Sequence, residues 1–228
     1  MMRLLTIGHS NHNLEKFIRL LEDNGIMVLV DVRTAPYSRY NPQFNKESLE
    51  NALSQRGIQY AYAGKYLGGR PSDPTCYKGR VLPSEDADYL HEVDYPEVMK
   101  RPWFVQGINR LLELADEQTA AIMCSEENPA ECHRHHLIAR FLIAEHPEVD
   151  VRHIRGDGTV FGAKSLHVSV GEPAAEPEAE EAAAPGKRAG RPKRAPRKRA
   201  AAPPEGEPAA PAAAAAPKRP RPRKKKVE

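Results

Sequence analysis

The sequence predicts an α/β fold of three layers (α/β/α), in which helices cover both faces of a mainly parallel sheet. Short apolar runs alternate with helical patterns along positions 1–170 of the 228-residue chain, and this alternation is typical of βαβ units. The run at residues 26–32, Ile-Met-Val-Leu-Val-Asp-Val, is almost entirely apolar and β-branched, as expected of a strand covered on both faces. We therefore expect a globular domain over residues 1–168 and a tail of different character over residues 169–228.

Five apolar runs predict the strands of this sheet, at residues 3–7, 26–32, 58–63, 119–124 and 149–154. The first run stops at Gly8, and the third alternates between apolar and polar side chains. We expect the fifth run to form the last strand of the domain.

Helical spacing predicts the connections between the strands. Apolar residues recur three and four positions apart after Asn13, which we expect to cap the first helix, and the pattern stops at Asn24 and Gly25. Asn45 is expected to cap a second helix over residues 46–55. We expect an irregular loop at residues 64–83 and short helical pieces at residues 84–100. Two longer helices are expected at residues 102–115 and 132–144.

The C-terminal segment, from position 171 to position 228, has a composition that does not support a hydrophobic core. It contains 18 Ala and 12 Pro, no aromatic residue, and 15 Lys or Arg against 8 Glu. Because so little apolar surface cannot offset the chain entropy lost on folding, we expect a disordered tail. Positions 1–170 hold 19 Lys or Arg against 23 Asp or Glu, so an acidic domain precedes a basic tail.

Composition also excludes several classes of protein. No apolar run approaches the roughly 20 residues of a membrane-spanning helix, and residues 1–10 lack the pattern of an export signal. The 3 Cys are then expected to be free thiols in a reducing compartment. We expect a cytoplasmic protein with no membrane partner.

Polar residues directly follow three of the predicted strands: His9 and Ser10, Asp31 and Arg33, and Cys124 and Glu126. In parallel sheets ligands bind beyond the carboxyl ends of the strands, so we expect these residues to share one site. His9 either acts as a general base near neutral pH or is held by backbone hydrogen bonds. Asp31 and Arg33 either bind a substrate or pair with each other.

Residues 123–134 combine a strand end, a polar loop and a helix start. A helix N-terminus attracts anions and lowers the pKa of a nearby thiol. One interpretation is a pocket in which Arg33 and Arg134 bind an anion while Cys124 or Glu126 acts on it. The other is that Cys124 is an inert packing residue, because free Cys is among the most buried residue types.

The same segment is also compatible with a metal site. Cys124, Cys132, His9 and one of His133, His135 or His136 could together offer the sulfur and nitrogen ligands of a tetrahedral zinc site, which makes zinc the candidate cofactor. Their spacing, Cys-x7-Cys-His, is not a familiar zinc pattern. In the predicted loop, Gly68 and Gly69 indicate either a close approach of the backbone to a ligand or a flexible turn.

The tail contains two dense basic runs. Residues 187–199 carry eight positive charges and no negative one, and residues 218–226 add seven more. Such segments bind polyanions by releasing counterions, and Gly190-Arg191-Pro192 resembles the AT-hook of the DNA minor groove. We expect DNA or another polyanion as partner and an association with the nucleoid; the alternative is a solubilising tail. The residues expected to bind nucleic acid are Lys187, Arg188, Arg191, Lys193, Arg194, Arg197, Lys198 and Arg199.

Four separated motifs resemble the domain of unknown function 488 family: Thr6-Ile7-Gly8-His9-Ser10, Asp31-Val32-Arg33, Leu67-Gly68-Gly69, and Cys124-x-Glu126-x-x-Pro129-x-x-Cys132-His133-Arg134. The resemblance covers about residues 2–157. It implies an intracellular α/β domain whose site is formed by these polar residues, and it implies no reaction. A looser similarity to rhodaneses and Cys-phosphatases implies sulfur or phosphoryl transfer at Cys124, although nine residues here separate Cys124 from Arg134 where those enzymes have a loop of five.

Three hypotheses for the function follow. The first is a DNA-associated α/β protein whose site binds or processes a small anionic or nucleic-acid ligand. The second is a non-catalytic DNA-binding module that contains a structural Cys/His cluster, with or without zinc. The third is a sulfur or phosphoryl transferase. The sequence leaves open whether the protein is an enzyme.

Overall fold

The computed structural model describes residues 2–166 of the chain. The basic runs, the AT-hook-like motif and the predicted disorder of the tail therefore lie outside the described residues. Within the described part, none of the helices combines the length and the apolar content needed to cross a membrane.

The predicted α/β architecture is confirmed. Six strands form one sheet in the order β3-β2-β4-β1-β5-β6, and every neighbouring pair is parallel except β5 and β6. The strands are β1 (Met2–Gly8), β2 (Val28–Asp31), β3 (Gln59–Tyr62), β4 (Ala120–Cys124), β5 (Val149–Ile154) and β6 (Val160–Gly162). The first five match the predicted runs. The prediction that the fifth run ends the sheet is wrong, because the short antiparallel strand β6 follows it.

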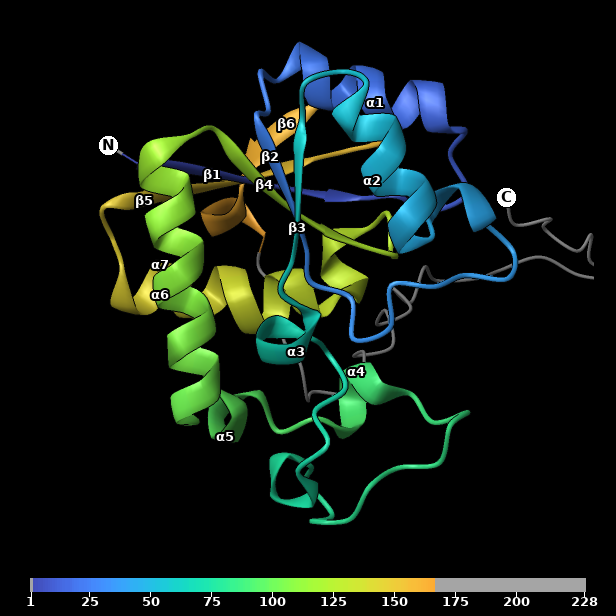
Figure 1. Ribbon diagram of the computed structural model, residues 1–228. Helices are drawn as coiled ribbons and strands as arrows, with labels where there is room; N and C mark the ends of the chain where they lie inside the picture. The colour runs from blue at the N-terminus through green and yellow to red at the C-terminus, as the bar shows by residue number, and fades with distance from the viewer. Residues whose placement is uncertain (1, 167–228) are drawn as a thin grey trace, which may run out of the picture. The chain divides into compact units, whose positions relative to one another are not determined.

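Helices cover both faces of the sheet (Figure 1). Two helices, α1 (Leu14–Asp23) and α2 (Lys46–Ser54), contribute Phe17, Leu21 and Leu53 to a core on one face. The core of the other face is built from α3 (Gly64–Leu67), α5 (Tyr95–Met99), α6 (Pro102–Glu117) and the segment from Arg134–Ala139 to α7 (Arg140–Glu145). This arrangement confirms the three predicted layers.

The helix starts follow two different patterns. Asn13 caps α1 as predicted, because its side-chain oxygen accepts a hydrogen bond from the Lys16 backbone N–H at 2.7 Å. Asn45 precedes α2 but its side chain does not cap it. Its oxygen instead accepts from the Ser38 backbone N–H at 2.7 Å and so ties the loop that follows β2 to the start of α2.

The predicted irregular loop at residues 64–83 is partly helical. It begins with α3, contains the 3₁₀ turn Pro74–Cys76, and pairs Tyr77 with Val93 in a single bridge. The short helical pieces predicted in residues 84–100 are α4 (Tyr89–Glu92) and α5. The segment between β3 and α6, which we call the excursion, therefore returns to the sheet and packs beside the carboxyl ends of the strands.

The sheet register decides where the polar residues meet. Gly8 at the end of β1 pairs with Cys124 at the end of β4, and Asp31 at the end of β2 pairs with Met123. The carboxyl ends of three adjacent strands therefore lie side by side, and each delivers one of the polar motifs to the same edge.

Candidate functional site

Backbone hydrogen bonds join the three motifs at this edge. The His9 N–H donates to the Cys124 carbonyl at 3.0 Å, and the Ser10 N–H donates to the Ser125 carbonyl at 2.8 Å. The Val32 N–H donates to the Met123 carbonyl at 3.0 Å. The convergence of the His9, Asp31 and Cys124 segments, which the sequence predicts, is thus a property of the structure.

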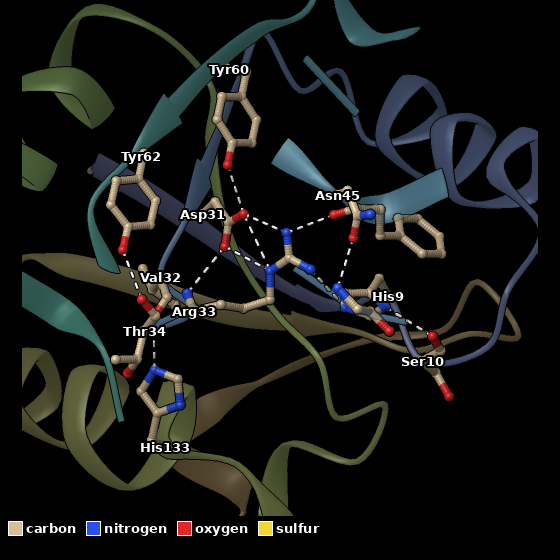
Figure 2. Close-up of polar contacts among 12 residues, drawn as sticks. His9, Ser10, Asp31, Val32, Arg33, Thr34, Asn45, Tyr60, Tyr62 and His133 are labelled. Carbon is tan, nitrogen blue, oxygen red and sulfur yellow. Dashed lines mark hydrogen bonds and ion pairs between the residues drawn. The ribbon is translucent and has the colours of Figure 1, made fainter. Parts of the chain in front are cut away.

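Asp31 and Arg33 form a buried ion pair (Figure 2). Arg33 donates from Nε to Asp31 Oδ1 at 2.9 Å and from Nη2 to Oδ2 at 2.6 Å. Nη2 also donates to the Phe44 carbonyl at 2.8 Å, and the Tyr60 hydroxyl donates to Asp31 Oδ2 at 2.7 Å. Burial raises the pKa of Tyr60, and the Asp31 charge adds to that shift. Of the two interpretations of Asp31 and Arg33, the geometry matches mutual pairing.

His9 completes this network from the end of β1. Its Nδ1 lies 2.8 Å from the Ser10 carbonyl, which can only accept, so Nδ1 carries the proton. Its Nε2 then accepts from Arg33 Nη1 at 3.1 Å, and its ring stacks on Phe44 at 4.4 Å between centroids. Burial lowers the pKa of His9 to about 4. His9 is therefore neutral near pH 7 and has both ring nitrogens in hydrogen bonds.

Arg134 is fully buried and holds the loop that follows β4. Its Nη1 donates to the Glu126 carbonyl, its Nη2 to the Glu127 carbonyl at 2.6 Å, and its Nε to Thr6 Oγ1 at 3.3 Å. The expected anion pocket between Arg33 and Arg134 does not match this geometry, because each donor nitrogen of both guanidinium groups already has a protein partner. The loop also turns carbonyl groups toward Arg134, unlike the N–H cradle of a rhodanese or a Cys-phosphatase.

Cys124, Cys132 and His133 form a compact buried cluster. Their Sγ and ring nitrogen atoms all lie within 4.8 Å of one another. His133 Nδ1 lies 3.5 Å from Cys124 Sγ and 3.9 Å from Cys132 Sγ. Of the residues considered as metal ligands, these three are brought together. His9 instead accepts from Arg33, and neither His135 nor His136 belongs to the cluster.

Hydrogen bonds around the thiols favour a thiolate at Cys132. Burial opposes ionisation, but the hydrogen bond from Cys124 and the charge of Arg134 lower the pKa of Cys132 well below its ordinary value. The pKa of Cys124 is raised, because its proton is held in the hydrogen bond to Cys132 and because the thiol is buried. The Arg134 backbone N–H, 3.5 Å from Cys132 Sγ, also points at that sulfur. A reactive low-pKa thiol at Cys124 does not match this arrangement.

A backbone carbonyl and a glycine fix the orientation of the His133 ring. Its Nε2 donates to the Val32 carbonyl at 3.2 Å (Figure 2). This leaves the Nδ1 lone pair directed at the two sulfurs. A Cβ on Gly69 would lie 2.6 Å from His133 Cγ, so a side chain there would displace the ring. Gly69 does allow the predicted close approach, but its neighbour is the His133 imidazole.

The cluster lines a pocket of about 660 Å³. Arg33 and Glu126 also line it, as do Arg70 and Tyr95 from the excursion between β3 and α6. Glu126 is exposed, and partial desolvation raises its pKa. Arg70 is exposed, and its guanidinium stacks over Tyr89 at 4.2 Å. The pocket thus combines the buried thiols with charged groups at its solvent side.

The other two predicted ligand-binding residues, Ser10 and Gly68, are not among the residues that line this pocket. The Ser10 hydroxyl donates to Asn11 at 3.4 Å. Gly68 packs against Thr34, where a Cβ would lie 3.1 Å from the Thr34 Cα. Sequence reasoning missed Tyr95 and the Val32 carbonyl. Val32 lies inside the Asp31-Val32-Arg33 motif, but a carbonyl contact has no side-chain signature.

Comparison with known proteins identifies one family. The model described as "Domain of unknown function DUF488" matches residues 13–141, which is more than half of the chain and includes Cys124, Cys132 and His133. No curated protein and no solved structure matches the chain.

Proposed function

The chain belongs to the DUF488 family, whose description names no activity, and from the geometry of the thiol–imidazole cluster we propose that the protein is zinc-dependent, with Cys124, Cys132 and His133 as the ligands. The observation that carries this proposal is the position of the three donor atoms. In a tetrahedral site with Zn–S near 2.3 Å and Zn–N near 2.0 Å, sulfur and nitrogen are separated by about 3.6 Å. The corresponding separations here are 3.5 and 3.9 Å.

The surroundings of the cluster support a metal over free thiols. Two sulfurs and one imidazole form the ligand set that selects zinc among the common divalent cations. A ligating histidine usually donates its other ring N–H to a carbonyl or carboxylate, as His133 does to Val32 at 3.2 Å. Burial of both cysteines favours a dry coordination sphere.

We assign a catalytic type of site, with one coordination position left for water or substrate. Structural zinc sites have four protein ligands, whereas catalytic sites have three and an open position. Among the described residues the cluster offers three, and all three line the 660 Å³ pocket. A zinc ion there would lower the pKa of a bound water to near 7 and polarise a substrate oxygen, so the proposed reaction class is metal-assisted hydrolysis. Glu126, at the pocket wall, is the proposed proton acceptor, and His9 positions Arg33.

Elemental analysis tests the metal proposal directly. Protein purified with zinc in the medium and then dialysed is expected to contain about one zinc per chain. Cys124→Ser, Cys132→Ser and His133→Ala should each reduce this content at least tenfold. Cobalt(II) reconstitution should give thiolate-to-cobalt charge-transfer absorption that each cysteine variant weakens.

Cys76→Ser is the matched control. Cys76 is also a buried free thiol, but it belongs to the 3₁₀ turn after α3 and not to the cluster. This variant should keep the zinc content of the wild type. Less than a tenth of a zinc per wild-type chain, or an equal loss in the Cys76 variant, would contradict the proposal.

For the tail we retain the proposal that it binds DNA or another polyanion. It rests on the sequence alone, since residues 187–199 carry eight positive charges and no negative one. In this view the tail brings the acidic domain to a nucleic acid, and the zinc site acts separately from it.

A further inference from the structure

Tyr95 lines the same pocket as the cluster, and among the described residues its hydroxyl has no hydrogen-bond partner. The side chain is 5% exposed, and its OH is buried without a partner among the described residues. Tyr95 lines the same pocket as Cys124 and Cys132 and packs in the same hydrophobic core. A buried hydroxyl without a partner is unfavourable, so a ligand in the pocket that accepts a hydrogen bond from Tyr95 would relieve this cost.

The charges around the cluster indicate the sign of that partner. Two thiolates would neutralise a bound zinc ion, which leaves the buried Arg134 as a fixed positive charge. Arg134 follows His133 in the chain, and its backbone N–H lies 3.5 Å from Cys132 Sγ. Its own contacts are to two carbonyl groups and one hydroxyl, which carry no net charge. The carboxylates of Glu126 and Glu127, in the loop that Arg134 holds, interact with this charge, and an anionic ligand at the open position would add to its compensation.

A second cation lies at the solvent side of the pocket. Arg70 has its backbone N–H bonded to Thr34 and its guanidinium stacked on Tyr89, and no ion pair involves it among the described residues. Its planar donor edge can contact a carboxylate or phosphate group in two places. The pocket lining thus offers a neutral donor in Tyr95 and a cationic one in Arg70, beside the carboxylates of Asp88, Glu126 and Glu131.

We propose that the pocket binds a small oxyanion, a carboxylate or phosphate group, with one oxygen at the open metal position, a hydrogen bond from the Tyr95 hydroxyl, and the remaining charge facing Arg70. This inference rests on the proposed zinc site and adds the class of ligand. The volume of about 660 Å³ accommodates a molecule larger than the anionic group itself.

Titration of the cobalt(II)-substituted full-length protein tests the assignment by the change in visible absorption. The probes are acetate, methyl phosphate and imidazole, a neutral metal ligand. Tyr95→Phe should lower the affinity for acetate and for methyl phosphate at least tenfold, because a hydrogen bond to a charged group is lost. The affinity for imidazole should stay unchanged. Arg70→Gln changes an exposed residue and should lower the affinity for both anions at least threefold. It should also reduce the salt dependence of that affinity. Binding of only one anion would identify the source as carboxylate or phosphate.

Tyr77→Phe is the matched control, because Tyr77 is a buried tyrosine whose hydroxyl donates to the Pro71 carbonyl at 2.6 Å, and it does not line the pocket. It should lower thermal stability and leave all three affinities unchanged. Tyr95→Phe should keep or raise the melting temperature, since it removes a buried hydroxyl without a partner. Unchanged anion affinities in both the Tyr95 and Arg70 variants would overturn the ligand assignment. Failure of imidazole to bind, or of cobalt to load, would overturn the zinc site itself.

Discussion

At the scale of single residues, the imidazole of His133 depends on two neighbours that have no reactive groups. The Val32 carbonyl selects the tautomer by accepting from Nε2, and Gly69 leaves the space in which the ring lies. Neither residue would be a ligand. Both determine whether the Nδ1 lone pair faces the two sulfurs, so the metal affinity should be sensitive to them.

Gly69→Ala tests this dependence. The new methyl group would lie 2.6 Å from His133 Cγ, closer than real contacts allow, so the ring must rotate or shift away from the sulfurs. We expect zinc affinity to fall by about 10- to 100-fold, as other changes around metal ligands produce. Competition with a chromophoric chelator measures the affinity. Gly162→Ala, where a Cβ would meet no atom within 4 Å, should behave as wild type. Equal affinities of the two variants would contradict the positioning role.

The sequence predicts residue identities at the site better than their contacts. The three ligand residues and the Gly68-Gly69 pair are visible in the sequence, as are Arg33 and Arg134. The sequence offers the pairing of Arg33 with Asp31 as one of two alternatives. It does not show that His9, 24 positions away, accepts from Arg33 Nη1, or that backbone carbonyls accept from Arg134. A guanidinium group looks the same in a sequence whether it binds a ligand or a loop.

At the scale of elements, the helix predicted over residues 132–144 begins differently from an ordinary α-helix. Arg134–Ala139 is a π-helical segment that continues into α7, and it buries Arg134 and His135 together. A chain of hydrogen bonds runs from Arg134 Nε through Thr6 on β1 to His153 on β5, and from His153 to His135. The pattern of apolar residues predicts helix here but cannot distinguish α from π. It also misses β6, whose three residues are too few to show a period.

This chain of hydrogen bonds requires a neutral His153. Thr6 Oγ1 accepts from Arg134 and donates to His153 Nδ1 at 2.7 Å, and His153 Nε2 donates to His135 Nδ1 at 3.0 Å. Burial lowers the pKa of His153 to about 3, and the charges of His135 and Arg134 contribute. In the unfolded chain the pKa is near 6.5. The stabilisation is therefore complete above about pH 6.5 and is lost as the pH falls from there toward 3.

His153→Asn should remove this acid sensitivity. We expect the metal-free wild-type protein to lose about 1.4 kcal/mol of unfolding free energy per pH unit below pH 6 from this histidine alone. The variant should be less stable at pH 7.5, because its hydrogen bonds are lost, but its stability should fall less steeply with pH. Urea unfolding followed by circular dichroism at several pH values measures both. His91→Asn removes an exposed histidine that pairs with Asp88 at the surface, and as the control it should change the slope much less than the His153 variant does. If the unfolding free energies of the His153 variant and the wild type fell equally steeply with pH, His153 would not be the source of the acid sensitivity.

At the scale of the whole molecule, strand order explains why distant motifs form one site. β1 lies between β4 and β5, and β4 lies between β1 and β2, so the ends of β1, β4 and β2 are consecutive along one edge. The rule that ligands bind at the carboxyl edge of a parallel sheet predicts this meeting point without knowledge of the strand order. The rule does not predict that Tyr95 lies at this pocket. Tyr95 belongs to α5, in the segment between β3 and α6, and the return of that segment to the sheet depends on contacts such as the Tyr77–Val93 bridge.

The charge division between domain and tail leads to the last prediction. Positions 1–170 carry 23 acidic against 19 basic groups, so only the tail should attract DNA. Replacing the eight basic residues of positions 187–199 by Gln in the full-length chain should weaken duplex binding by at least tenfold. The slope of log affinity against log salt should become shallower by about 0.9 for each phosphate that the variant no longer neutralises. Fluorescence anisotropy over a range of salt concentrations measures both quantities.

Cys124→Ser should bind DNA as the wild type does, since the proposed zinc site acts separately. If the Gln variant kept the salt-dependence slope of the wild type, or if the Cys124 variant lost most of its DNA affinity, DNA binding would be assigned to the domain instead.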